Sequence, residues 1–350
     1  MRLNLPELIF AVTNHCNHSC KMCYYHDALD RDMEELEANE IERISLSLGD
    51  IKQLLISGGE PFLREDLAQI CEIFWRNNHL RHLFIPTNGS VQEKILSGIL
   101  RITEQLQNVS LSIMLSLEGL EKQHDDIHDA QGAFQQVVET VKELNLLRFH
   151  LLKQRKQMFA LHLNTVVTAI NIDAVLPLMK FVKQKLWVDL HTFSPMRGSG
   201  RDTDHTPPSG DKFEQLVKQA QPYFLHYLSQ KYIGQLNPQK ALNILNRRYQ
   251  IWINVLNGGS LPVPCSAGQS IGVLEPNGDV RLCEMKPLVG NVRKNDYDFG
   301  KVWWGKKADE MRMSITNCSC THACFLNASS RFQLASHCPP TNSPPHVSAS

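Results

Sequence analysis

The sequence lacks any long hydrophobic run, since no stretch approaches the about 18 consecutive apolar residues that a membrane-spanning helix needs. Its N-terminal segment, MRLNLPELIFAV, holds a short apolar run that Glu7 interrupts, and no signal-peptide cleavage site follows. It also lacks excess charge, because 36 Lys and Arg balance 36 Asp and Glu. No global basic field would attract nucleic acid or anionic lipid. We therefore expect a cytoplasmic protein with neither a membrane nor a nucleic-acid partner.

Cysteine, in contrast, is abundant, with ten residues in a chain of 350. Three of them lie within residues 16–23 and five within residues 265–324, whereas Cys71 and Cys338 stand apart. Disulfides are rare in a reducing compartment, so the clustered cysteines indicate metal or redox use. Cys71 lies in an apolar helical pattern, AQICEIFW, and we expect it to be a buried core thiol.

Short apolar, β-branched runs alternate with amphipathic stretches over the first two hundred residues. The predicted strands are residues 8–13, 53–57, 82–86, 109–117, 160–168 and 187–192. Predicted helices between them include residues 66–76, 133–146 and 173–185. This alternation predicts a parallel sheet and an α/β fold. Six units are too few for an eight-unit barrel, so we expect an open, partial (β/α)6 barrel.

Composition divides the chain into four parts. The barrel core is expected at residues 1–200, and a Gly-, Pro- and Ser-rich loop at 198–210 marks its end. A helical connector follows at 201–260, with helices at 212–230 and 238–255. Residues 261–330 form a small cysteine-rich extension of hairpin and helix, with a turn at Asn277-Gly278. The Pro- and Ser-rich tail, 331–350, is expected to be disordered.

The first cysteine group, CNHSCKMC, places Cys16, Cys20 and Cys23 directly after the first predicted strand. Barrel folds place their chemistry at this end of the strands. Three thiolates can hold three irons of a 4Fe–4S cube and leave the fourth iron open to a substrate or cofactor, whereas four would close the cluster. The alternative is a zinc site completed by one of His15, His18 and His26.

The C-x3-C-x2-C spacing after a first strand resembles the radical S-adenosylmethionine (SAM) superfamily. Three further segments fit that family in order: SGGEP (57–61), PTNG (86–89), and LSLEG (115–119) followed by HDDIHDAQGAF (124–134). Each stands at the end of a predicted strand, and together the motifs span about the first two hundred residues. The resemblance implies that SAM is cleaved reductively at a 4Fe–4S cluster and that a hydrogen atom is then taken from a substrate C–H bond.

The resemblance also implies which residues contact SAM. They are Met22, Gly58, Gly59, Glu60, Thr87, Asn88, Ser116 and His128. The two glycines let the backbone approach the methionine part of SAM closely, with Glu60 assisting. The short polar residues can hold ribose or carboxylate, and their alternative role is turn capping.

Two positions depart from the family pattern. The family usually has an aromatic residue just before the third cysteine, and here Met22, an apolar and adaptable side chain, takes its place. Where the related motif HDxxRG has an arginine that reaches the SAM carboxylate, this chain has His128. A histidine can donate a hydrogen bond, but it cannot donate two parallel hydrogen bonds to one carboxylate as an arginine does. His124 and His128, four residues apart, could alternatively form a metal-binding face.

The second cysteine group resembles the SPASM extension of this superfamily, or its shorter twitch form. Its members are Cys265, Cys283, Cys318, Cys320 and Cys324, with Cys338 beyond them. Five cysteines suffice for one auxiliary 4Fe–4S cluster but not for two. We expect the ligands to be Cys265, Cys283, Cys320 and Cys324, with Cys318 as the spare or in place of Cys320. A zinc ribbon that includes His322 is the alternative.

The resemblance implies an external electron donor, such as a flavodoxin or ferredoxin, and net oxidation or modification of a small molecule. A peptide or protein maturase is the first alternative, although Cys16 lies too near the N-terminus for the leader-binding domain common in thioether maturases. A non-catalytic zinc protein is the second. His191, Arg197 and Arg201, in and after the last predicted strand, are candidate substrate or SAM contacts.

Overall fold

The computed structural model describes residues 3, 5–154, 158–231, 237–262, 264–315 and 318–336. The strands are β1 (Glu7–Thr13), β2 (Gln53–Gly58), β3 (His82–Thr87), β4 (Ser110–Ser116), β5 (Phe159–Val167), β6 (Leu190–Pro195), β7 (Ile271–Leu274), β8 (Asp279–Arg281) and β9 (Gly290–Asn291). The helices are α1 (Ala38–Ser47), α2 (Leu67–Asn78), α3 (Gln92–Gln105), α4 (Lys122–His128), α5 (Ala133–Lys153), α6 (Val175–Lys185), α7 (Gly210–Lys231), α8 (Pro238–Leu256), α9 (Phe299–Trp303), α10 (Lys306–Ile315) and α11 (Ala323–Ser336).

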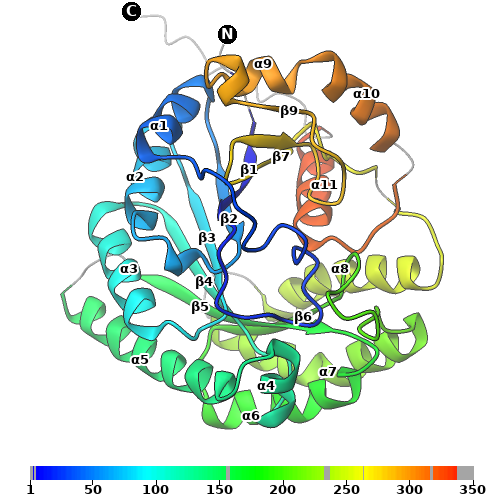
Figure 1. The fold of residues 1–350 in the computed structure, drawn as a ribbon. Coiled ribbons are helices and arrows are strands. Elements are labelled where there is room, and N and C mark those ends of the chain that lie inside the picture. Colours follow the sequence, from blue (N-terminus) through cyan, green and yellow to red (C-terminus); the bar gives the residue numbers. More distant parts are fainter. Residues whose placement is uncertain are drawn as a thin grey trace, which may run out of the picture.

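The strands form one nine-stranded sheet in the order β6-β5-β4-β3-β2-β1-β7-β8-β9. Strands β1 to β6 run parallel, and β7 continues the parallel sheet on the other side of β1, with Leu8 opposite Gly272. Strands β8 and β9 then add antiparallel pairs. The sheet curves into an incomplete ring, with α1, α2, α3, α5 and α6 outside it (Figure 1). The expected α/β partial barrel is therefore confirmed.

Alternation of buried and partly buried residues explains how β5 packs. Along β5 every second residue is buried, because one face meets the helices and the other faces the interior of the ring. A single apolar core joins the sheet to α1, α2, α3 and α5. A second core around Phe193, Tyr249 and Trp252 packs the end of the sheet against α7 and α8. Together these cores hold the carboxyl ends of β1 to β6 around one opening.

Some boundaries differ from the sequence-based ones. The last strand begins at Leu190 rather than at Trp187, whose side chain is exposed. The predicted hairpin at Asn277-Gly278 is confirmed as the β7–β8 turn, but sequence periodicity did not indicate that β7 pairs with β1. Helix α11 continues to Ser336, past the expected start of the tail, and residues 337–350, which include Cys338, lie outside the described residues.

No helix in the described part of the chain combines the length and apolar character needed to cross a lipid bilayer. Cys71, on α2, is fully buried in the main core, as its helical context predicted.

Candidate active site

The first three cysteines lie on a long loop that follows β1 and crosses the front of the strand ring (Figure 1). Buried Asn14 closes this loop, because its side-chain amide donates to the carbonyls of Ala28 and Arg31. Thr13 donates to Glu35 farther along the same loop, at 2.6 Å. The cysteines therefore lie on a braced segment at the carboxyl end of the sheet.

The loop brings the three thiols together. The backbone amide of Cys23 donates to the carbonyl of Cys20, which forms a tight turn. Burial, with smaller contributions from Cys20 and Cys23, raises the pKa of Cys16 to about 12. Burial and then the neighbouring Cys20 raise the pKa of Cys23 to about 11. All three side chains remain partly exposed. Cys16 and Cys23 therefore favour the thiolate form only once metal charge is present, which suits a cluster site.

Gly58 and Gly59 lie against the cysteine loop. A Cβ atom on Gly59 would stand 2.0 Å from the carbonyl oxygen of His15, and one on Gly58 would stand 2.1 Å from that of Thr13. The amide of Gly59 donates to Thr13, and that of Glu60 donates to His15. These two amides attach the loop after β2 to the cysteine loop and are not available to a ligand. The backbone carbonyls of the two glycines are the groups that could accept a hydrogen bond from an ammonium ion.

The carboxylate of Glu60 is buried and joins the ends of β2 and β3. It accepts from the amide of Phe62, the hydroxyl of Thr87 and the amide of Asn88. Burial raises its pKa to about 7, although these hydrogen bonds act to lower it. In this structure Glu60 and Thr87 organise the loops around the opening. Ser116 ends β4 at the same edge of the sheet and is half-buried.

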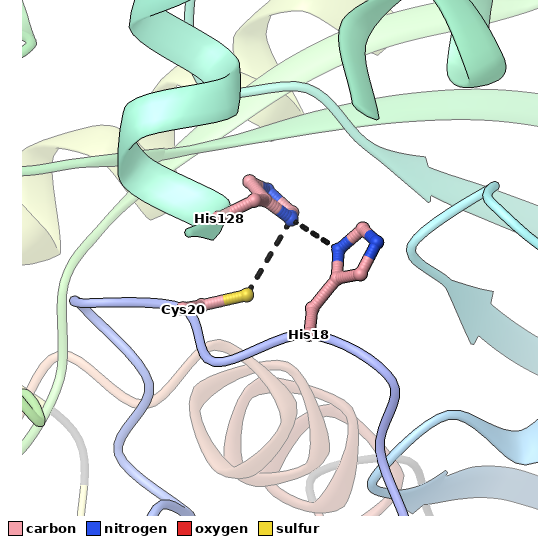
Figure 2. Close-up of side chains that lie close together, drawn as sticks. All are labelled: His18, Cys20 and His128. Atoms are coloured by element: carbon pink, nitrogen blue, oxygen red, sulfur yellow. Dashed lines mark hydrogen bonds between the residues drawn. The ribbon is translucent and has the colours of Figure 1, made fainter. Parts of the chain in front are cut away.

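The two residues that depart from the family pattern have well-defined surroundings. Met22 is buried and packs with Ile127 and Met196. His128 is the last residue of α4 and is buried beside the cysteine loop. Its Nδ1 atom lies 3.4 Å from the sulfur of Cys20 and 3.0 Å from Nδ1 of His18 (Figure 2).

Glu118, which sequence reasoning did not single out, holds His128 from the other side. Its carboxylate lies 2.5 Å from Nε2 of His128 and is fully buried. Burial alone would lower the pKa of His128, but the charges of Cys20 and Glu118 outweigh burial and raise it to about 10. Burial and the neighbouring His128 lower the pKa of His18 to about 4. The sequence feature that could have identified Glu118 is its place in LSLEG, just before the two histidines of α4.

These side chains also form two groups with metal-ligand atoms close together. Ligand atoms of His18, Cys20 and His128 lie within 4.8 Å of one another, and so do those of Glu118, His124 and His128. The proposed metal face of His124 and His128 therefore does converge. The ring of His124 is buried, however, and its Nδ1 accepts from the backbone amide of Glu118.

The second cysteine group also converges. Burial raises the pKa of Cys283 to about 12, with further contributions from Cys320 and Cys265. Burial likewise raises that of Cys320 to about 11, with contributions from Cys318 and Cys265. Cys324 lies near enough to Arg197 to influence its pKa. Five thiols from segments far apart in the sequence are therefore gathered in one region.

Glu284 connects the two cysteine groups, and sequence reasoning missed it. It follows Cys283, yet its carboxylate accepts from the hydroxyl of Tyr24, the residue after Cys23, at 2.6 Å. It also accepts from Arg197 at 3.3 Å and from His322. Although burial opposes ionisation, Arg197 and His322 lower its pKa to about 2. Its only sequence signal was its place beside a cysteine.

The other candidate contacts lie in different surroundings. Arg197 stacks on the ring of Tyr24, 3.9 Å from its centroid. His191 is buried on β6, and its Nε2 lies 3.0 Å from the hydroxyl of Thr165, so it belongs to the sheet interior. Arg201 is exposed beyond β6.

An open cavity of ≈ 500 Å³ lies where the loop after β6, the end of α8 and the second cysteine group meet. Arg197, Met285, Cys320 and His322 contribute to its wall. The cavity wall therefore includes two hydrogen-bond partners of Glu284, Arg197 and His322, together with one member of the second cysteine group.

Glu284→Ala is expected to lower the free energy of unfolding by about 3 kcal/mol, because Arg197 is left partly buried without its carboxylate partner. Urea unfolding at matched metal content measures the loss. Glu214→Ala is the control, since Glu214 pairs with Lys218 on the exposed face of α7. That control should cost less than about 0.5 kcal/mol. An equal loss of unfolding free energy in the two variants would show that the contacts of Glu284 do not stabilise the fold.

Residues 10–153 match the family described as the radical SAM superfamily. A probable GTP 3',8-cyclase from Methanothermobacter marburgensis is 36% identical over 97 residues, which are 27% of this chain and 31% of that protein. An AdoMet-dependent heme synthase from Methanosarcina barkeri is 23% identical over 314 residues, 86% of this chain and 82% of that protein. The chain thus matches under a third of the cyclase but most of the heme synthase.

Among solved structures, native anSMEcpe with bound AdoMet and Cp18Cys peptide superposes with a TM-score of 0.59. The alignment covers 89% of this chain and 82% of that one, at 17% sequence identity. The two proteins therefore share a fold over most of this chain.

Proposed function

We propose that this chain, whose residues 10–153 match the radical SAM superfamily, cleaves SAM reductively at a 4Fe–4S cluster, as members of that family do, and takes a hydrogen atom from a substrate C–H bond. The observation that carries the proposal is the convergence of Cys16, Cys20 and Cys23 on one braced, partly exposed loop at the carboxyl end of the sheet. Three thiolates would hold three irons and leave one open.

The chain's own residues would bind and orient SAM beside this loop. The carbonyls of Gly58 and Gly59 would accept from the SAM ammonium group. Glu60, through Thr87 and Asn88, would hold the strand ends in place, while Ser116 would contact the ribose or carboxylate. Met22 would form an apolar surface for the adenine. When bound, the reduced cluster supplies the electron that splits SAM into methionine and a 5′-deoxyadenosyl radical.

The second cysteine group would hold one auxiliary 4Fe–4S cluster. Cys265 and Cys320 both influence the charge state of Cys283, and Cys265 also influences that of Cys320, which supports all three as ligands. The fourth ligand would be Cys324, as the sequence suggested, or Cys318, which lies near Cys265 and Cys320. Iron content decides between them, because only the true ligand's alanine variant should lose the auxiliary cluster.

We propose a small molecule as the substrate, bound in the cavity beside Arg197 and His322, with net oxidation or modification as the outcome. Two curated relatives are named for chemistry on small molecules, GTP and heme. A peptide substrate is the second candidate, because a similar solved structure contains a bound peptide. An external flavodoxin or ferredoxin would supply electrons, and the cytoplasm would be the compartment.

Metal and product analysis tests the proposal. Anaerobically purified protein is expected to carry about eight irons per chain, from two cubes. With SAM and a reductant it should release 5′-deoxyadenosine. Deuterium transfer from a candidate substrate into that product would then identify the substrate. Zinc in place of iron, with no product, would instead favour the non-catalytic metal protein that the histidines beside Cys20 also permit.

A further inference from the structure

A second cavity, of ≈ 380 Å³, lies between the end of α6, the residues that lead into β6 and the last turns of α7. Its wall combines cationic, aromatic and amide side chains from both sides, Lys183, Lys185, Trp187, His226, Tyr227 and Gln230. The cavity lies before the start of β6, whereas Arg197 and the contacts of Glu284 follow the end of that strand. A strand rises about 3.3 Å per residue, so β6 alone separates the two places by roughly 17 Å. The cavity is therefore distinct from the candidate active site.

The charged side chains of this wall are basic. None of the described residues that line the cavity is Asp or Glu, whereas Lys183 and Lys185 both contribute to it. Asp189, the nearest acid along the chain, is already engaged, because its carboxylate lies 3.0 Å from Arg148 and accepts from a backbone amide at 2.7 Å. Burial, and then the charge of Lys183, lower the pKa of His226 on the facing helix. The cavity therefore has a positive field that would attract an anion.

Tyr227 supplies a second, independent observation. Its side chain is only 2% exposed, and its hydroxyl has no hydrogen-bond partner among the residues that the structure describes. A buried hydroxyl without a partner costs about 1–3 kcal/mol, so such groups are normally satisfied by protein, water or a ligand. Since Tyr227 is part of the cavity wall, an oxygen of a bound anion could accept this hydrogen bond.

Trp187 adds a flat apolar surface beside the lysines. Its side chain is 70% exposed. Its position is nevertheless held, because its carbonyl accepts from Asn145 at 2.8 Å and the guanidinium of Arg148 lies 5.8 Å from its ring centroid. Stacking of a planar base on an aromatic side chain contributes about 1–3 kcal/mol. An exposed indole next to two lysines therefore suits a ligand that carries both a planar ring and an anionic group.

We propose that this cavity binds a nucleotide-type ligand, with its phosphate groups against Lys183, Lys185 and Tyr227 and its planar ring against Trp187. Lysine is a common phosphate-binding residue, and the cavity volume lies within the about 300–1,000 Å³ of small-molecule sites. Because the cavity and Arg197 lie at opposite ends of β6, the ligand is an effector and not the substrate of the candidate active site. The inference goes beyond the proposed function and does not depend on it.

Calorimetric titration of the full-length, anaerobically purified protein tests the proposal with uridine diphosphate, pyrophosphate and uridine as probes. Saturating SAM without a reductant keeps the proposed SAM site filled. Uridine diphosphate is expected to bind about tenfold more tightly than either fragment, because it alone uses both the lysines and the indole.

Two double variants with the same change in net charge locate the site. Lys183→Gln with Lys185→Gln should weaken the binding of uridine diphosphate about tenfold, because two charge-assisted contacts to phosphate are lost. Lys180→Gln with Lys212→Gln is the control and should leave the affinity unchanged. Lys180 and Lys212 are exposed lysines of α6 and α7 that do not line the cavity.

Two single variants assign the ring and hydroxyl contacts. Trp187→Ala should weaken uridine diphosphate about fivefold and leave pyrophosphate unaffected. Tyr227→Phe should weaken both about threefold without lowering the free energy of unfolding, because the hydroxyl that it removes has no partner among the described residues. Absence of binding at millimolar uridine diphosphate, or equal effects of the two lysine double variants, would overturn the inference. Failure to cleave SAM, in contrast, would contradict only the proposed function.

Discussion

Cys20→Ala is expected to abolish the release of 5′-deoxyadenosine and to remove about four irons per chain. Cys20 lies at the centre of the first group, since it influences the charge states of both Cys16 and Cys23 and contacts His128. Two thiolates cannot hold three irons of a cube, so the variant should lose the whole first cluster. Iron and sulfide analysis, with chromatography of the SAM products, measures both effects.

The matched control is Cys71→Ala. Cys71 is also a free cysteine, but it is fully buried in the main core on α2. Its replacement should reduce stability by about 1 kcal/mol through a small cavity and leave iron content and product release at wild-type levels. If Cys20→Ala kept its iron and its activity while the control behaved as described, the three-thiolate site would be rejected.

Gly59→Ala is expected to destabilise the protein by about 3 kcal/mol and to reduce iron binding at the first cysteine group. The added methyl would stand 2.0 Å from the carbonyl oxygen of His15 and 3.0 Å from the amide nitrogen of Cys16. Both obstacles are backbone atoms, so the β2 loop and the cysteine loop must move apart. Overpacking of this kind costs about 1–3 kcal/mol or more. Chemical unfolding and iron analysis would detect the two effects.

Gly132→Ala separates this steric effect from a conformational one. Gly132 has a φ of +81°, but a Cβ there would meet no atom within 4 Å. It should therefore cost only the about 1–2 kcal/mol of a left-handed backbone, with iron binding unchanged. Wild-type iron content in Gly59→Ala would mean that the close approach of the two loops does not position the cysteines.

Prediction from sequence succeeded where the signals were local. The strand–helix alternation indicated the parallel sheet because side-chain periodicity is a property of each segment. The sequence also indicated that the first cysteines, Gly58 and Gly59, and the polar residues after β3 and β4 lie at strand ends, because each motif follows its own strand. The Asn277-Gly278 hairpin was found for the same reason.

Prediction failed where contacts join distant segments. Sequence reasoning did not find that Glu284 meets Tyr24, 260 residues away, or that Glu118 lies against His128. Both carboxylates adjoin recognised motifs, but neither carries a spacing that specifies its partner. The helix of the extension also continued farther than its composition indicated, to Ser336.

The sequence by itself determined which groups can do chemistry: three thiols at short spacing on one loop, five more thiols near the other end, and glycines beside the first group. These properties depend on neighbours along the chain. Only the tertiary structure decided which charges face one another, because pairing of β1 with both β2 and β7 brings the two cysteine groups to the same opening. The physical reason is that hydrogen bonds and charge effects act over a few ångströms in space, whatever the separation in sequence.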